Sequence, residues 1–244
     1  MKLSEYAEML LEQPKQPQDG NMNEVSIGKH RVARKYNDPP LVQQYVSNFF
    51  DEGYGQKGDE RIENSREAYR NRGGIGFRVP EIIHSDGVIE EVEMVQGSSL
   101  EEYVLSGDRE EVEDIAGKFA EALKETHENG FAIRDCRLEN FIYEDCSFSD
   151  ENYIAAVDTE WFEADASEED IADDLRGLAV NISQLPEDTR REFRQAFEEN
   201  YGESLENYVT TRAKRDMVIE TTRDNLAKRD FNKIKNTLQY LTSR

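Results

Sequence analysis

The sequence predicts an α+β fold with two lobes, a small β-rich N-terminal lobe and a larger helical C-terminal lobe. Short apolar runs bounded by turns prevail before residue 97, and apolar residues with helical periodicity prevail after it. A third observation is a set of polar residues that directly follow strand-like runs in the second half. We expect an N-terminal helix and linker at 1–20, the small lobe at 21–97 and the helical lobe at 98–244.

The small lobe is predicted to contain several strands and one charged helix. The strands are expected at 32–35, 79–83 and 88–95, and the helix at 59–72. Successive side chains of a strand point to opposite faces, so a register shift of one residue decides whether Lys35 or Arg34 faces inward. Both alternatives stay open at this point.

The helical lobe is predicted to begin after a turn at 96–99 and to be dominated by a long helix from Asp108 to Asn129. The apolar positions of this helix keep a 3.6-residue period: Val112, Ile115, Ala116, Phe119, Ala120 and Leu123. Asp108 and Glu111 have the spacing of a capping box, and Asn129-Gly130 is a typical helix end. Further helices are expected from Thr189 to Arg244.

The segment with the most chemical content runs from Ile133 to Asn140. Asp135 follows an apolar run, Asn140 precedes another, and Asp158 follows a third strand candidate at 153–157. An Asp in such a loop can orient an attacking hydroxyl and accept its proton, while an Asn and a second Asp can hold Mg²⁺ against nucleotide phosphates. We therefore predict Asp135 as catalytic, and Asn140 and Asp158 as metal ligands.

The order of these motifs resembles the protein-kinase-like superfamily. The closest resemblance is to RIO-type kinases and to the kinase subunit of the archaeal KEOPS complex. It is carried by Lys35-Tyr36-Asn37-Asp38-Pro39, by Arg66-Glu67-Ala68 and by the Val79-Pro80 strand. Aminoglycoside- and choline-type phosphotransferases share the same core.

The resemblance implies roles for residues of the small lobe. Lys35 would bind the nucleotide phosphates and pair with Glu67, or Arg34 would take its place if the register shifts. The hinge backbone at Glu93 and Val95 would bind the adenine. In the other lobe, Arg137 would contact the γ-phosphate as a catalytic residue, and Asp174 would brace the catalytic loop.

The sequence departs from the kinase pattern at several places. Ile133 stands where a His is usual, and the metal motif is Asp158-Thr159-Glu160, in which the resemblance implies that Glu160 would assist a second metal. No Gly-rich phosphate loop precedes Lys35, and Gly73-Gly74-Ile75-Gly76 follows it instead. Without a Gly-rich loop the phosphates would be poorly covered, so we expect the departure to affect the catalytic rate more than nucleotide binding.

The chain is strongly acidic, with a net charge of −23 and a pI near 4.5. Asp and Glu are spread over the whole length, a distribution that resembles proteins of salt-in halophiles. An acidic surface for a basic partner is the alternative. Direct nucleic-acid binding is not expected, because it requires a basic face.

Cysteine content and hydropathy bear on the compartment. Cys136 and Cys146, with only three scattered His, do not make a zinc site, and reduced thiols in a cytoplasm are expected. A short amphipathic segment at 3–12 has acidic residues that do not suit a signal peptide. We expect a cytoplasmic protein with no membrane association.

The sequence thus predicts an ATP- and Mg²⁺-dependent phosphotransferase that transfers a γ-phosphate to a hydroxyl. The acceptor would be a protein, as for an atypical Ser/Thr protein kinase, or a small molecule, as for aminoglycoside- or choline-type enzymes. The other hypothesis is a nucleotide-binding pseudokinase within a protein complex. The missing Gly-rich loop favours the pseudokinase, and the joint presence of Lys35, Asp135, Asn140 and Asp158 opposes it.

Overall fold

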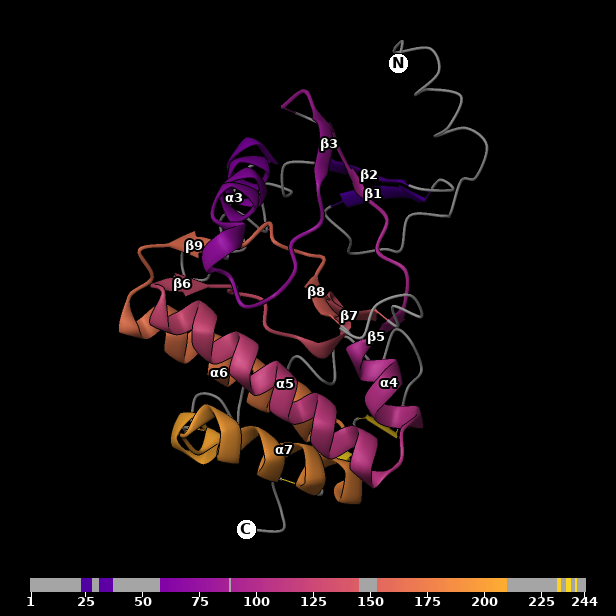
Figure 1. Cartoon of the computed structure of the whole chain (residues 1–244), viewed down its shortest axis with the longest axis vertical. Helices are drawn as coiled ribbons and strands as arrows, with labels where there is room; N and C mark the ends of the chain where they lie inside the picture. The colour runs from indigo at the N-terminus through magenta and orange to yellow at the C-terminus, as the bar shows by residue number, and fades with distance from the viewer. Residues whose placement is uncertain are drawn as a thin grey trace.

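The computed structural model describes residues 23–27, 31–36, 58–87, 89–144 and 153–209, with residues 232, 233, 236, 237 and 240. The predicted N-terminal helix within 1–20, Cys146 and most of the helices predicted beyond residue 209 lie outside the described residues. Figure 1 shows a sheet with one helix above a layer of long helices. This is the predicted two-lobed α+β arrangement.

A four-stranded antiparallel sheet forms the small lobe. Its strands are β1 (Asn23–Ile27), β2 (Arg31–Tyr36), β4 (Ile89–Glu93) and β3 (Ile82–Ser85), paired in that order. The helix α3 (Gly58–Arg70) packs against this sheet and leads into a 3₁₀ turn, η2 (Arg72–Gly74). Its buried residues are Arg61, Ile62, Ser65 and Ala68, which form one helical face.

The helical lobe is built on α5 and α7, which pack along each other (Figure 1). Its helices are α4 (Leu100–Ser106), α5 (Arg109–Glu128), α6 (Glu168–Ser183) and α7 (Glu187–Tyr201), followed by η4 (Leu205–Tyr208). The long helix was predicted correctly, since Asp108 and Glu111 form its capping box and every predicted apolar position is buried. No helix among the described residues is long and apolar enough to cross a bilayer.

Short strands lie between the sheet and the long helices (Figure 1). One group is β5 (Ser98–Ser99), β7 (Phe141–Glu144) and β8 (Tyr153–Ala156), and the other is β6 (Phe131–Ala132) and β9 (Glu163–Ala164). The turn η3 (Leu138–Asn140) connects towards β7. The two strand-like runs that flank the predicted catalytic loop therefore belong to different small sheets.

Within the part of the chain that the structure describes, two segments link the lobes. The hinge 94–97 runs from β4 to β5 and passes close to β7, where a Cβ on Gly97 would lie 2.0 Å from the Tyr143 carbonyl oxygen. The segment at Arg78 pairs with β8, because Arg78 N donates to Ile154 O and Ala156 N donates to Arg78 O. Both segments fix the β8 end, and with it Asp158, relative to the small-lobe sheet.

An aromatic cluster forms the centre of the core. Phe119 on α5 lies 5.3 Å from Phe77 and 4.8 Å from Phe141, measured between ring centroids. The rings of Phe193 and Phe197 on α7 lie 6.4 and 6.2 Å from that of Phe119, again between centroids. Since Phe77 comes from the inter-lobe segment and Phe141 from β7, this core supports the base of the predicted catalytic loop.

Candidate active site

The loop 133–140 takes its shape from a buried carboxylate on α6. Asp174 accepts hydrogen bonds from Ile133 N and Arg134 N, both at 2.7 Å. These bonds hold Arg134 at φ 67°, a left-handed conformation that a non-glycine residue adopts only when its surroundings impose it. The bracing role that the resemblance implied for Asp174 is confirmed.

Asp135 follows directly and has two partners. Arg137 contacts both of its carboxylate oxygens, with Nε 2.7 Å from Oδ1 and Nη2 2.8 Å from Oδ2. Asn140 Nδ2 donates to Asp135 Oδ2 at 2.8 Å and to the Asp135 carbonyl at 3.1 Å. The loop thus brings together Asp135, Arg137 and Asn140 as the sequence predicted, although Arg137 points to Asp135.

Asp158 lies beside this loop because the backbones are hydrogen-bonded. Val157 N donates to Asn140 O at 2.9 Å, which places Asp158 next to Asn140. Asp158 Oδ1 is buried and accepts no hydrogen bond from the described residues. Burial raises the pKa of Asp158 to about 7, and the Glu160 carboxylate adds to the shift while the Arg34 guanidinium opposes it.

Strand β2 presents Arg34, rather than Lys35, to Asp158. Arg34 Nη1 lies 3.7 Å from Asp158 Oδ1, and Arg34 Nη2 donates to the Val157 carbonyl. Lys35 is the next residue in the strand, so its side chain starts on the opposite face, which it shares with the buried Ala33. The register that puts the arginine inward is the alternative that the sequence left open.

Among the described residues Glu67 forms no ion pair with Lys35, and its predicted role in nucleotide binding stays a prediction. Glu67 lies outside the buried face of α3. Ser65 and Arg66 of α3 hydrogen-bond the sheet, Ser65 to Glu90 Oε2 at 2.8 Å and Arg66 to Ser85 Oγ at 3.0 Å. Residues on one face of a helix are three or four positions apart, and Glu67 is not at this spacing from Ser65. The side chain of Glu67 therefore does not share the buried face that packs on the sheet.

Glu160 is engaged in a buried ion pair. Its Oε1 contacts Arg61 Nη2 on α3, and both side chains are almost fully buried. Asn64 donates to the Glu160 carbonyl, and Ser65 Oγ lies 3.4 Å from Thr159 Oγ1. Glu160 therefore anchors the segment after Asp158 to α3, which is a different role from the second metal ligand that the sequence suggested.

The hinge residues predicted for adenine binding lie at the end of β4. Glu93 N donates to Glu81 O at 2.8 Å, and the Glu93 carboxylate accepts from Arg78 Nη2 at 2.7 Å. Arg78 Nη1 also lies 3.2 Å from Glu144, whose pKa burial raises. The Glu93 side chain thus anchors the hinge to Arg78, and adenine binding at Glu93 and Val95 stays a prediction.

Sequence reasoning missed a buried network behind the catalytic loop. His127 Nε2 lies 3.1 Å from Asp174 Oδ2, and His127 Nδ1 lies 2.8 Å from the Tyr201 hydroxyl. Burial raises the pKa of Tyr201, so the phenol stays protonated and can donate. One feature of the sequence could have indicated this network. His127 lies six residues before Ile133, on the helix face whose other positions are mostly apolar.

The donor set between the lobes fits a hard divalent cation. The side-chain nitrogen of Asn140, Nδ2, donates to Asp135. The side-chain oxygen of Asn140, Oδ1, is the atom that can act as a metal ligand. The buried Asp158 Oδ1 supplies a second oxygen, and Mg²⁺ prefers carboxylate and carbonyl oxygens. Among the described residues there is no cluster of three or more His, Cys, Asp or Glu suited to a metal, so substrate phosphates and water would complete the coordination.

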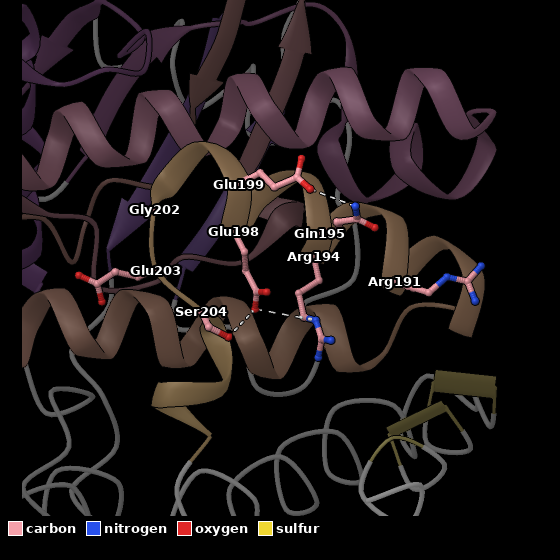
Figure 2. A pocket seen from close by; sticks show the side chains of 8 residues that line it. All are labelled: Arg191, Arg194, Gln195, Glu198, Glu199, Gly202, Glu203 and Ser204. Carbon is pink, nitrogen blue, oxygen red and sulfur yellow. Dashed lines mark hydrogen bonds and ion pairs between the residues drawn. The ribbon is translucent and has the colours of Figure 1, made fainter.

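A separate groove lies on α7 and the turn after it (Figure 2). It has a volume of about 480 Å³, and its lining residues are polar: Arg191, Arg194, Gln195, Glu198, Glu199, Gly202, Glu203 and Ser204. Figure 2 shows Gln195 bonded to Glu199, and Glu198 to both Arg194 and Ser204. None of the residues around Asp135 or Asp158 lines this groove.

The chain resembles solved structures in fold, and no protein-family model or curated protein sequence matches it. The gentamicin complex of APH(2")-IIa has a TM-score of 0.54 at 11% identity, over 100% of this chain and 97% of that one. Its streptomycin–ATP ternary complex has the same TM-score at 12% identity, with 91% and 89% covered. WbdD, a bifunctional kinase-methyltransferase, has a TM-score of 0.51 at 14% identity, over 85% of this chain and 50% of that one.

These likenesses define the fold as protein-kinase-like. The predicted two-lobed fold is therefore confirmed, and one of these neighbours, WbdD, is a bifunctional kinase-methyltransferase. The closer resemblance to RIO-type and KEOPS kinases, and the halophilic character, stay predictions.

Proposed function

We propose that this chain is an ATP- and Mg²⁺-dependent phosphotransferase acting on a hydroxyl. The observation that supports this best is the joint placement of Asp135, Asn140 and Asp158 between the lobes, with Arg34 reaching Asp158 from the small lobe. Each of these groups has a use in phosphoryl transfer, where positioning and charge stabilisation supply most of the rate. The neighbouring complex with ATP supports the same nucleotide.

In this proposal the chain's own groups divide the work. Asp135 orients the acceptor hydroxyl and accepts its proton, and Arg34 binds nucleotide phosphates through its planar guanidinium. Asn140 and Asp158 would hold Mg²⁺, which neutralises phosphate charge when bound. Arg137 is bound to the Asp135 carboxylate. Once Arg137 is released from Asp135, its guanidinium would contact the transferred phosphoryl group. The hinge backbone at Val95 would bind the base.

The acceptor is a protein or small-molecule hydroxyl. The two APH(2")-IIa neighbours hold gentamicin and streptomycin, which supports a small molecule for this chain. Acceptor contacts depend on loops rather than on the shared core, so the fold leaves both acceptor classes open.

The test is nucleotide binding and phosphate release by the full chain in concentrated KCl. We expect calorimetry to show ATP binding with Mg²⁺ and much weaker binding with excess EDTA. Asp135→Asn should keep ATP binding and lose phosphate transfer by on the order of 10²–10⁴-fold. Asp158→Asn should weaken both binding and turnover. Full activity of the Asp135→Asn variant would refute the proposed base.

A nucleotide-binding pseudokinase is the second candidate, and the contact between Arg137 and Asp135 favours it. Arg137 occupies both carboxylate oxygens of Asp135, where an acceptor hydroxyl would have to bind. Magnesium-dependent ATP binding without phosphate release, in the wild type and in Arg137→Ala alike, would support this candidate. Recovery of phosphate release in Arg137→Ala would instead show that Arg137 blocks a working site.

A further inference from the structure

Glu90 on β4 is a fully buried carboxylate in the small-lobe sheet. Removing a carboxylate from water costs several kcal/mol unless hydrogen bonds and an opposite charge compensate for the loss. The neighbours of Glu90 must therefore supply this compensation. One is Ser65 of α3, whose hydroxyl donates to Glu90 Oε2.

The strand register identifies the second neighbour. Arg34 of β2 and Glu90 of β4 are directly opposed in the antiparallel ladder. Directly opposed residues have their side chains on the same face, with Cβ atoms about 4.5–5.5 Å apart. The face is the inner one, because Arg34 also reaches Asp158 and Val157 across the cleft.

Two acidic residues therefore lie near Arg34: Asp158, which the guanidinium contacts, and Glu90, which opposes Arg34 in the ladder. Asp158 and the Val157 carbonyl lie towards the helical lobe, and Glu90 lies beside Arg34 within the sheet. A guanidinium binds a phosphate well when its planar fork is already oriented, since less side-chain entropy is then lost. When nucleotide and cation occupy the Asp158 side, Glu90 is the carboxylate that remains to hold Arg34.

We propose that Glu90 is the positioning residue of the phosphate site, a carboxylate supplied by β4 that orients Arg34 towards the nucleotide phosphates. The inference rests on the proposed function and assigns to the sheet the task that the sequence assigned to Glu67 on α3. From α3, the Ser65 hydroxyl contacts Glu90. Arg34 and Glu90 both belong to the sheet and are opposed in its ladder, so neither charge is supplied by α3.

Glu91 provides a matched control on the same strand. It is also buried, at 2% exposure, but it lies opposite Ala33 on the other face of the sheet, and its carboxylate contacts Arg31 at 3.3 Å. Glu91→Gln removes the same charge from the same strand without touching the inner face. Any general effect of losing a buried carboxylate should appear in both variants.

The experiment compares MgATP with adenosine, which has the base but no phosphates, in calorimetric titrations of the full chain in KCl. Glu90→Gln should weaken MgATP binding roughly tenfold, as loss of an outer-shell partner typically does, and leave adenosine unchanged. Glu91→Gln should leave the ratio of the two affinities unchanged. The double variant Arg34→Gln/Glu90→Gln should bind MgATP no more weakly than Arg34→Gln alone.

The outcomes separate the inference from the proposed function. If wild type binds MgATP and Glu90→Gln changes MgATP and adenosine equally, or behaves as Glu91→Gln does, the positioning role is refuted. If wild type binds no MgATP, both the proposed function and this inference fail. Should Glu90→Gln not fold, Glu90→Asp keeps the charge and shortens the side chain. It should weaken MgATP severalfold with adenosine unchanged, and an unchanged ratio would overturn the inference.

Discussion

An apolar region and a charged region meet at the segment 158–162, and they are held together in different ways. On one side Phe162 packs against Phe131 at 5.4 Å and joins the apolar core of the helical lobe. On the other side Asp158 and Glu160 belong to a charged cluster beneath α3, which we define as Arg34, Arg61, Glu90, Asp158 and Glu160. The aromatic side gains free energy from burial, whereas the charged cluster must first offset desolvation.

The difference indicates which region serves stability and which serves binding. A buried ion pair is often no more stabilising than apolar side chains of the same size, so stability alone does not account for five charged residues here. Burial of that charge next to the proposed phosphate site is better explained by what it binds. The following predictions test this division, from the largest expected effect to the smallest.

The largest loss of stability is expected in the aromatic core. Phe119→Ala should lower the free energy of unfolding by about 3–5 kcal/mol, because Phe119 is fully buried among four other rings. Urea denaturation at fixed KCl measures it, and the folded fraction should keep its ATP affinity. Leu105→Ala, at a position 48% exposed, is the control and should cost less than about 0.5 kcal/mol. Similar losses at the two positions would contradict the assignment of stability to this core.

In the buried ion pair between Arg61 and Glu160, replacing both residues should destabilise the protein less than replacing Arg61 alone. Arg61→Met leaves Glu160 buried without its cation and should cost about 3 kcal/mol or more. The double variant Arg61→Met/Glu160→Met should recover much of that loss, because no uncompensated charge remains. The same urea denaturation measures both variants. Additive losses would mean that each side chain stabilises the fold independently of the other.

The pH dependence of the free energy of unfolding should show the raised pKa of Asp158. Its pKa is raised to about 7 in the folded protein, mainly by burial and then by Glu160, against an ordinary value of 3.8. Because the folded pKa is the higher one, the folded state binds the proton more tightly. The stabilisation is complete below pH 4 and is lost as the pH rises through about 7. Without Mg²⁺, the stability difference between wild type and Asp158→Asn should change across this window. A difference that is flat from pH 4 to 8 would contradict the raised pKa.

The helical lobe shows how much of the fold the sequence could predict. Apolar residues on α5 repeat with the helical period, and its caps depend on residues three positions apart, so both signals are local. The catalytic loop was predictable for a similar reason, since Asp135 and Asn140 are linked to each other within the loop. Local spacing was sufficient where the contacts themselves were local.

The charged cluster could not be predicted in this way. Whether Arg34 or Lys35 faces inward depends on the pairing register between β2 and β4, which is set by contacts between distant segments. The Glu90 contact with Ser65 spans 25 residues and the Arg61 contact with Glu160 spans 99. Charged residues are mostly exposed in folded proteins, so sequence reasoning does not predict that Glu90 is buried.

The smallest effect is expected for an ion pair of the same chemistry on the surface. Lys118 Nζ lies 2.7 Å from Asp114 Oδ2 on α5, with the two side chains 43% and 60% exposed. The acidic partner precedes the basic one by one helical turn, the favourable orientation, and a double-mutant cycle should give a coupling of about 0.3–0.5 kcal/mol. Multimolar KCl should remove most of this coupling, because the Debye length falls to about 3 Å at 1 M. The coupling between Arg61 and Glu160, measured in the same salt series, should change little, since burial keeps ions away from the pair. If both couplings fell together, Arg61 and Glu160 would be open to solvent, and the contrast between a buried charged cluster and the charged surface would be lost.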